Sequence, residues 1–312
     1  MEIIFWSVIL VLSLTALVKS ADAFTDAAEQ IGLFFGMSSF IVGATIVSFG
    51  SSMPELATSL MALASGATDF AVDNIIGSNV ANSLLVAGLA AVFVGTLKVK
   101  QQLIDVDLPF LFMSTAVFII FIMDGKFTWA EGLLSIVMLT IFILYSIRQG
   151  DAQDEHKPDL PKHFHPFKTV GKIVVTVFLI FVSSKFTIDS VSHIAEALNI
   201  APSIITMLAV AFGTSLPEII ISVRAAMAGR HDVALGNVFG SNTFNVLAVA
   251  GIPSFFGTLT VSHEAMLIGI PLLIVASLAF IFTTSDDKIQ KWEGMALLII
   301  YAVFVGKITG LF

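Results

Sequence analysis

Long apolar stretches, interrupted by short polar ones, follow one another along the whole chain. Most of them run for about 17 to 25 residues, the length that a helix rising about 1.5 Å per residue needs to cross a bilayer core about 30 Å thick. The pattern therefore predicts an all-α integral membrane protein. Ten transmembrane helices are expected, near residues 3–18, 40–64, 72–95, 104–123, 129–147, 170–186, 204–227, 233–256, 265–282 and 292–308.

The composition supports this prediction, because 57% of the 312 residues are hydrophobic and only 12% are charged. Soluble domains have about 45–50% apolar and about 25% charged residues, so a soluble core is excluded. The chain has no cysteine, which excludes disulfides, thiolate metal sites and thiol catalysis. The net charge of −8 argues against nucleic acid as a partner.

The distribution of positive charge predicts an orientation. If the amino terminus lies outside, all Lys and Arg residues except Lys126, Lys185 and Lys307 fall in cytoplasmic stretches, as the positive-inside rule requires. We therefore expect a multi-pass protein of a prokaryotic inner (cell) membrane, with both termini outside and the central loop in the cytoplasm. The first apolar stretch is expected to remain as a span, since Glu2 stands where a signal peptide would carry positive charge.

The sequence contains an internal repeat. GSSMPELATS at residues 50–59 reappears as GTSLPEIIIS at residues 213–222, and the same offset of 163 carries the pattern N-x-x-G-S-N-x-x-N from residues 74–82 to residues 237–245. Each half contains five predicted spans, and because five is odd, the second half would enter the membrane with the opposite orientation. The expected organisation is a first five-helix repeat at 1–148, a polar cytoplasmic linker at 149–168 and a second, inverted five-helix repeat at 169–312.

Both halves interrupt an apolar span with glycine and proline, at Gly50 to Pro54 and at Gly213 to Pro217. Paired interruptions of this kind are typical of secondary transporters, in which broken helices from two inverted repeats meet at an ion site near the bilayer midplane. Proline removes an amide and displaces the carbonyl four residues back, so Gly50 and Gly213 should present free main-chain oxygens. Close helix packing alone would not explain a glutamate beside each interruption.

Glu55 and Glu218 are those glutamates, and each lies within a predicted span. A carboxylate at the bilayer centre costs about 2.5 kcal/mol or more, and Arg224 lies at least a turn nearer the cytoplasm, so a bound cation is the natural neutralising charge. Two glutamates balance one divalent ion. Calcium takes six to eight hard oxygen ligands, and such donors surround the glutamates in the sequence: Ser51, Ser52, Thr214, Ser215, Ser78, Asn82, Ser241 and Asn245. The histidines lie outside this set, which argues against a transition metal.

The two motifs, GSSMPE and GTSLPE, each followed by N-x-x-G-S-N-x-x-N, resemble the two alpha repeats of sodium/calcium exchangers. The resemblance implies exchange of Na⁺ for Ca²⁺ by alternating access, with no cofactor and no covalent chemistry. It implies that Glu55 and Glu218 bind calcium together with main-chain oxygens of Ser51 and Thr214. It also implies a set of positions that line the sodium sites: Ser48, Ser52, Ser78, Ala211, Ser215 and Ser241. Asn82 and Asn245 match the polar pair beside these sites.

Two positions depart from the family pattern. Asn245 stands where potassium-dependent relatives carry aspartate, which argues against potassium dependence and leaves two carboxylates for several sodium ions, so exchange is expected to be electrogenic. Asp73 stands where the second repeat has Gly236, and the simplest interpretation is a carboxylate in the headgroup region. The His- and Asp-containing linker 149–168 is interpreted as a solvated connection.

The residues themselves leave the coupling ion open. A proton-coupled antiporter, or another monovalent cation/calcium antiporter of the same fold, would use the same two glutamates, because burial raises the pKa of a carboxyl group and lets it carry a proton. A passive cation channel is a further alternative, since rings of carboxylates also select cations. An enzyme is not expected, because the motifs contain no pairing of nucleophile and base.

Overall fold

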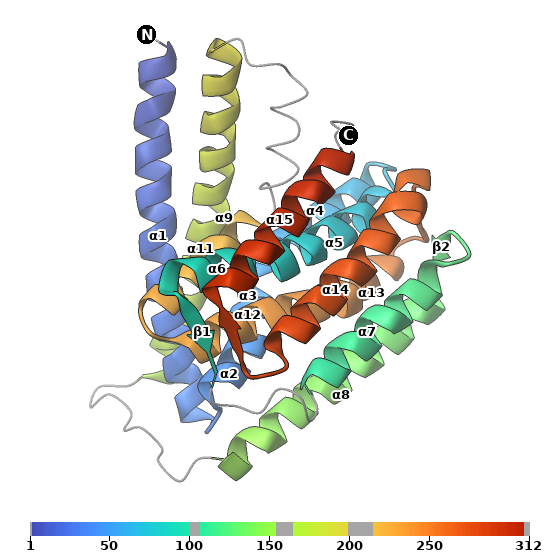
Figure 1. Cartoon of the computed structure of the whole chain (residues 1–312), viewed down its shortest axis with the longest axis horizontal. Helices are drawn as coiled ribbons and strands as arrows, with labels where there is room; N and C mark the ends of the chain where they lie inside the picture. Colours follow the sequence, from blue (N-terminus) through green and yellow to red (C-terminus); the bar gives the residue numbers. More distant parts are fainter. Residues whose placement is uncertain (1, 100–106, 154–164, 199–214, 309–312) are drawn as a thin grey trace.

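The computed structural model describes residues 2–99, 107–153, 165–198 and 215–308, which form a bundle of helices (Figure 1). Seven helices in these ranges are long and apolar enough to cross a membrane: Ile3–Phe34, Ser39–Ala64, Phe70–Val94, Trp129–Ser146, Pro166–Ile194, His231–Ser254 and Ala265–Thr284. The chain is therefore a helical, multi-pass membrane protein. The spans predicted at 104–123 and 204–227 lie partly outside the described residues, and the one predicted at 292–308 is a described helix, Lys291–Ile308, that is not among the seven, so the count of ten remains a prediction.

Two helices, α1 (Glu2–Phe34) and α9 (Pro166–Ala197), are much longer than the others and run side by side (Figure 1). Thr187 of α9 donates a hydrogen bond to Ser13 of α1 at 2.9 Å. The predicted end of the first span near residue 18 was wrong, because the helix continues for 16 more residues, to Phe34. At about 1.5 Å per residue α1 is about 50 Å long, which exceeds the thickness of a bilayer core.

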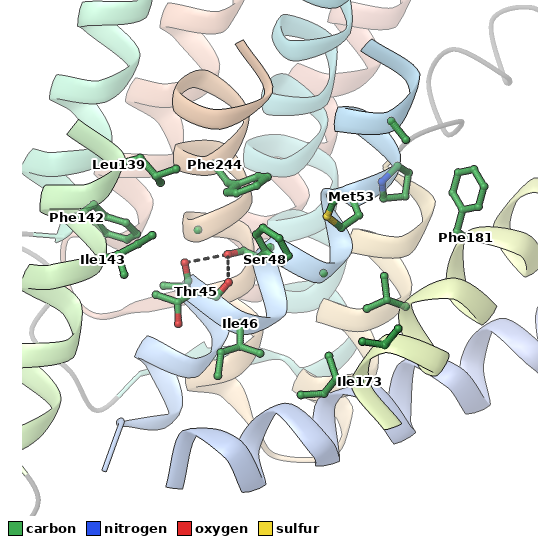
Figure 2. Close-up of a pocket in the computed structure, with 18 of the residues that line it drawn as sticks. Thr45, Ile46, Ser48, Met53, Leu139, Phe142, Ile143, Ile173, Phe181 and Phe244 are labelled. Carbon is green, nitrogen blue, oxygen red and sulfur yellow. Dashed lines mark hydrogen bonds between the residues drawn. The ribbon is translucent and has the colours of Figure 1, made fainter. Parts of the chain in front are cut away.

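The helix that carries the first GSSMPE motif is broken at Ser52. It runs as α2 (Ser39–Val42), the π-helical segment η1 (Gly43–Val47) and α3 (Ser48–Ser51), and continues as α4 (Met53–Ala64). Ser52 leaves helical geometry, with ψ at 7°, and a proline occupies the first turn of α4, where its missing amide is not needed. Thr45 and Ser48 donate their hydroxyls to carbonyls of the preceding turn, and Figure 2 shows the bonds of Ser48. The predicted interruption is confirmed in this half.

In the second half, α11 (Leu216–Met227) begins in the same way. Ser215 precedes it with ψ at 2°, and Pro217 lies in its first turn. Gly213 lies outside the described residues, so its free carbonyl stays a prediction.

The spans that carry the asparagine motifs contain π-helical turns. The first is α5 (Phe70–Val80), η2 (Ala81–Val86) and α6 (Ala87–Val94), and the second is α12 (His231–Phe244), η3 (Asn245–Val249) and α13 (Ala250–Ser254). π-Helical turns inside α-helices are rare and occur frequently at functional sites. Asn82 and Asn245 lie in η2 and η3, so both widened turns coincide with residues of the predicted site.

Glycines bring α12 against the broken helix. A Cβ atom at Gly240 would lie 2.2 Å from the carbonyl oxygen of Ala44, and one at Gly236 would lie 2.3 Å from that of Phe40. The spacing of four residues between these glycines is the small-xxx-small pattern that lets membrane helices approach closely. The contact sets α3, with Ser48 and the end of the broken segment, directly beside the motif residues of α12.

Two short ribbons connect the halves of the chain. Strand β1 (Thr96–Lys98) pairs antiparallel with β4 (Lys288–Gln290), and β2 (Lys126–Phe127) pairs antiparallel with β3 (Leu259–Thr260). These strands, which are only two or three residues long, were not predicted. The ribbons lie at the ends of helices. The helices not yet described are α7 (Asp107–Ile122), α8 (Trp129–Gln153), η4 (Ala265–Gly269), α14 (Ile270–Thr284) and α15 (Lys291–Ile308).

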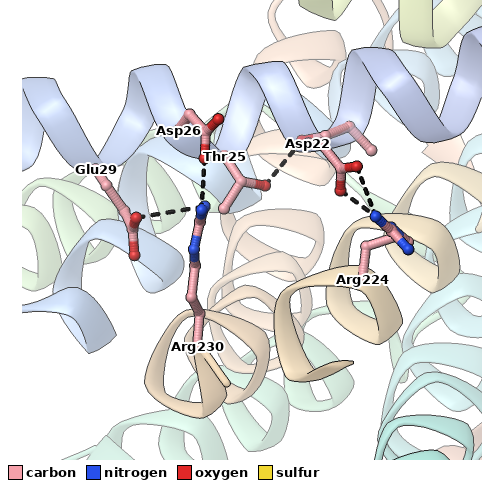
Figure 3. Close-up of polar contacts among 7 residues, drawn as sticks. Asp22, Thr25, Asp26, Glu29, Arg224 and Arg230 are labelled. Atoms are coloured by element: carbon pink, nitrogen blue, oxygen red, sulfur yellow. Dashed lines mark hydrogen bonds and ion pairs between the residues drawn. The ribbon is translucent and has the colours of Figure 1, made fainter. Parts of the chain in front are cut away.

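Ion pairs attach the second part of α1 to the second half of the chain (Figure 3). Arg224 binds both oxygens of Asp22, at 3.0 and 2.7 Å. Arg230 lies 2.6 Å from Asp26 and 3.4 Å from Glu29. The three acidic residues lie on one face of α1 because their spacing of four and three residues follows the helical turn. These contacts explain why α1 stays helical through a charged stretch that resembles a loop.

Candidate functional site

Glu55 and Glu218 are both fully buried, with no solvent-exposed surface. Each is the third residue of a helix, α4 or α11, where the partial positive charge of the helix terminus favours a carboxylate. Ser52 donates a hydrogen bond to Oε1 of Glu218 at 3.5 Å, at the long end of the range for such a bond. Because Ser52 precedes Glu55 by three residues, this contact brings the starts of α4 and α11 together inside the bundle.

Ser51 and Ser241, which the sequence placed in the site, lie against each other. Their hydroxyl oxygens are 3.2 Å apart, and the Ser51 hydroxyl also donates to Oδ1 of Asn237 at 3.0 Å. Asn237 in turn donates to the Ser222 hydroxyl at 2.9 Å. Asn237 was missed as a functional candidate, although it belongs to the repeated motif and has a counterpart at Asn74. It connects the end of α3 to both α12 and α11.

Three asparagines form a buried network between α5–η2 and α12–η3. Asn79 donates to the main-chain oxygen of Asn242 at 3.0 Å, Asn242 donates to the Ser83 hydroxyl at 2.9 Å, and Asn245 donates to Oδ1 of Asn79 at 3.0 Å. A fourth asparagine, Asn82, is fully buried beside them, and its side-chain amide makes no hydrogen bond to the described residues. The sequence predicted Asn82 and Asn245 as site residues and did not single out the other two.

Several buried oxygens of this region accept no hydrogen bond from the described residues. They are Oε2 of Glu218 and the amide oxygens of Asn82, Asn242 and Asn245. Buried polar atoms are normally paired, and unpaired ones in an apolar interior cost free energy. Carboxylate and amide oxygens are ligands for hard cations such as Ca²⁺. The donor chemistry at this place therefore fits a hard metal ion and no other ligand class as well.

The remaining predicted residues divide into two groups. Ser48, Ser52, Ser78 and Ser215 are described and buried within the bundle. Ala211 and Thr214 lie outside the described residues. In the described ranges no group of three His, Asp or Glu side chains is arranged to hold a metal ion. An ion bound between Glu55 and Glu218 would thus complete its shell with hydroxyl, amide and main-chain oxygens.

Asp73 does not belong to this cluster. It is exposed near the start of α5 and accepts a hydrogen bond from Ser262 at 2.9 Å. Its counterpart Gly236 is packed against the carbonyl of Phe40, a contact that an aspartate could not make. The departure from glycine at residue 73 is therefore compatible with the environment there, whereas the same residue at 236 would prevent the close approach of α12.

Two buried acidic residues at the starts of α4 and α11, among hard oxygen donors inside a helical membrane bundle, define a membrane transporter of cations. The sequence profile of the family described as "Sodium/calcium exchanger protein" matches residues 5–148 and 168–309. The chain therefore belongs to the sodium/calcium exchanger family.

Individual relatives agree with this assignment. The chain is 27% identical to the sodium/calcium exchanger MaX1 of Methanosarcina acetivorans, over 95% of this chain and 96% of MaX1. It is 30% identical to the putative antiporter CaxA of Alkalimonas amylolytica, over 95% of this chain and 96% of CaxA. Among solved structures, the sodium-calcium exchanger NCX_Mj in crystals soaked with Na⁺ and Sr²⁺ superposes with a TM-score of 0.81 at 29% identity, covering 97% of this chain and 98% of that one.

Proposed function

We propose that this protein is a secondary antiporter that exchanges Na⁺ for Ca²⁺ by alternating access at one buried site. The observation that carries the proposal is the pair of fully buried glutamates at the starts of α4 and α11. Two carboxylates taken out of water need compensating positive charge, since breaking such compensation costs several kcal/mol. The nearby arginines, Arg224 and Arg230, are engaged by Asp22, Asp26 and Glu29 of α1, which leaves a mobile cation as the partner of the glutamates.

The proposed architecture is ten transmembrane helices in two inverted five-helix repeats, residues 1–148 and 169–312, joined by the cytoplasmic linker 149–168. Reciprocal contacts support it. Asn74 donates to Ser59 and Asn237 donates to Ser222, which are the same contact displaced by 163 residues. The two ribbons are reciprocal in the same way. In the repeat β1 corresponds to β3 and β2 corresponds to β4, and the structure pairs β1 with β4 and β2 with β3. A two-fold relation between the halves produces such reciprocity.

In this proposal the calcium ion is held by Glu55 and Glu218 with main-chain oxygens of Ser51 and Thr214. Sodium ions compete for overlapping positions lined by Ser48, Ser52, Ser78, Ala211, Ser215 and Ser241, next to Asn82 and Asn245. The contact between Ser52 and Glu218 supports overlap, because a residue assigned to sodium touches a carboxylate assigned to calcium. Occupancy by either ion neutralises the same carboxylates, so the two ions exclude each other and the transport of one is coupled to that of the other.

The membrane is proposed to be a prokaryotic inner membrane, with both termini outside. In that orientation Arg224 and Arg230 lie at the cytoplasmic end of α11, where positive residues are favoured. Asp73 then faces the outer side.

The test is calcium uptake into proteoliposomes under an imposed sodium, potassium or proton gradient. We expect uphill uptake with a sodium gradient alone, and its loss in Glu55→Gln and in Glu218→Gln. Glu196→Gln is the matched control, because that side chain is 62% exposed and pairs with His193. Calcium uptake driven by a proton gradient in the absence of sodium would show that the coupling ion is the proton and not Na⁺. Calcium that runs down its own gradient without a counter-ion would identify a channel and refute the antiporter.

A further inference from the structure

A cavity of about 710 Å³ lies beside the broken helix, between its η1–α4 part, α8, α9 and α12 (Figure 2). Thr45 and Ser48 are the only polar side chains among its lining residues. Their hydroxyls donate to the carbonyls of Ile41 and Ala44, at 2.6 and 2.8 Å, and so are already engaged by their own helix. Apolar cavities without free polar groups stay dry. Water is therefore not the natural occupant of this space.

The cavity lies at the depth of hydrocarbon. Its walls include Leu139 to Ile143, well inside the candidate span Trp129–Ser146, and Ile173 to Phe181, inside the candidate span Pro166–Ile194. Its lining includes apolar side chains that are largely exposed, among them Phe49 at 51% and Phe178 at 64%. Bilayer hydrocarbon surrounds such residues in a membrane-spanning bundle. The volume of the cavity falls within the range of about 300–1,000 Å³ that holds small-molecule ligands.

We propose that this groove binds an acyl chain of a membrane phospholipid. An empty space of this size would forfeit the dispersion contacts of every atom that lines it, and a hydrocarbon chain restores them without leaving a polar group unpaired. In the groove the acyl chain would contact Gly50 and Pro54, the residues on either side of the helix break. Their neighbours Ser51 and Ser52 turn to the opposite side, toward Ser241 and Glu218. The lipid thus forms the back wall of the segment that carries the ion site.

The position of the lipid gives it a specific consequence for transport. At Phe244 the groove meets α12, and the ring of Phe244 packs edge-on against Phe49 at a centroid distance of 5.2 Å. The acyl chain therefore completes the packing between α3 and α12 on the face opposite Ser51 and Ser52. Exchange rate should depend on whether the available acyl chains fill the groove.

The test uses fluorescence quenching by phosphatidylcholine that is brominated near the middle of its acyl chains. The native Trp6, Trp129 and Trp292 are first replaced by phenylalanine, and Phe142→Trp then places one reporter in the lining of the groove, at a residue only 3% exposed. Phe280→Trp is the matched control, because Phe280 is 1% exposed in an apolar span and does not line the groove. We expect the brominated lipid to quench the Phe142→Trp reporter at least twice as strongly as the control.

A blocking substitution distinguishes the groove from the surrounding bilayer. Ala57→Phe adds a ring to the lining from α4 and should reduce quenching of the Phe142→Trp reporter to the level of the control. If Phe142→Trp does not yield a monodisperse protein, Leu139→Trp in the same wall serves as the reporter. Equal quenching of reporter and control, or quenching that Ala57→Phe leaves unchanged, overturns the proposal. Either result would assign the groove to another part of this chain, to a second copy or to bulk lipid. The readout does not require transport.

Discussion

Replacing Asn237 with leucine tests whether the polar network positions the ion site. Asn237 is fully buried, accepts from Ser51 at 3.0 Å and donates to Ser222 at 2.9 Å. A buried hydrogen bond contributes about 1 kcal/mol net, so Asn237→Leu should lower the free energy of unfolding by about 2 kcal/mol. Ser51 also belongs to the proposed calcium site. Loss of about 1 kcal/mol from calcium binding there would raise the half-saturating calcium concentration about fivefold.

The control removes the other end of the same network. Ser222→Ala breaks only the bond from the Asn237 amide and leaves the bond to Ser51 intact. We expect it to lower the free energy of unfolding by about 1–3 kcal/mol, because a buried donor is left unpaired. The half-saturating calcium concentration should stay unchanged.

Two measurements on each variant separate stability from positioning: thermal unfolding in detergent, and calcium uptake by proteoliposomes as a function of calcium concentration. A shift in half-saturation as large in Ser222→Ala as in Asn237→Leu would refute the positioning role. So would an Asn237→Leu protein that is destabilised but binds calcium normally, since Asn237 would then act on the fold alone.

Three further experiments test a close helix contact, an ion pair and the proposed orientation in the membrane. Gly240→Leu should prevent folding, because its side chain would meet the Ala44 carbonyl, whereas Gly171→Leu, with open space among the described residues, should give normal monodisperse protein in size-exclusion chromatography. Arg224→Gln should lower the melting temperature slightly at low salt and hardly at 1 M salt, because the Asp22 pair is about 40% exposed and worth at most about 1 kcal/mol. In this cysteine-free chain, an impermeant maleimide should label Lys126→Cys and not Arg148→Cys from outside intact cells; the reverse would invert the proposed orientation.

The sequence predicted the features that depend on local residue order. Apolar length located the membrane helices, and the pairing of Gly50 with Pro54 located a break that the structure confirms at Ser52. The boundary of the first span failed because the charges of residues 19–29 look like a loop. On the helix those charges are paired with Arg224 and Arg230, which lie some 200 residues later in the chain. No local pattern carries that information.

The site was predictable in its members and not in its connections. Glu55, Glu218 and the serines follow from their rarity or repetition within apolar spans. The role of Asn237 depends on a contact with Ser51, 186 residues away, and only the three-dimensional structure shows it. The π-helical turns at Asn82 and Asn245 were likewise not predicted, because helical propensity does not distinguish a π-helical turn from an α-helical one.

The two strand ribbons also determine the order in which the protein can be completed. Strands β1 and β2 both belong to the half that leaves the ribosome first, and their partners β4 and β3 lie more than 130 residues later. Until residues 259–290 are made, the newborn first half has open strand edges and lacks the later half that packs against it. Contacts so distant in sequence form slowly. The two ribbons can therefore close only late in synthesis, after residues 259–290 have been made.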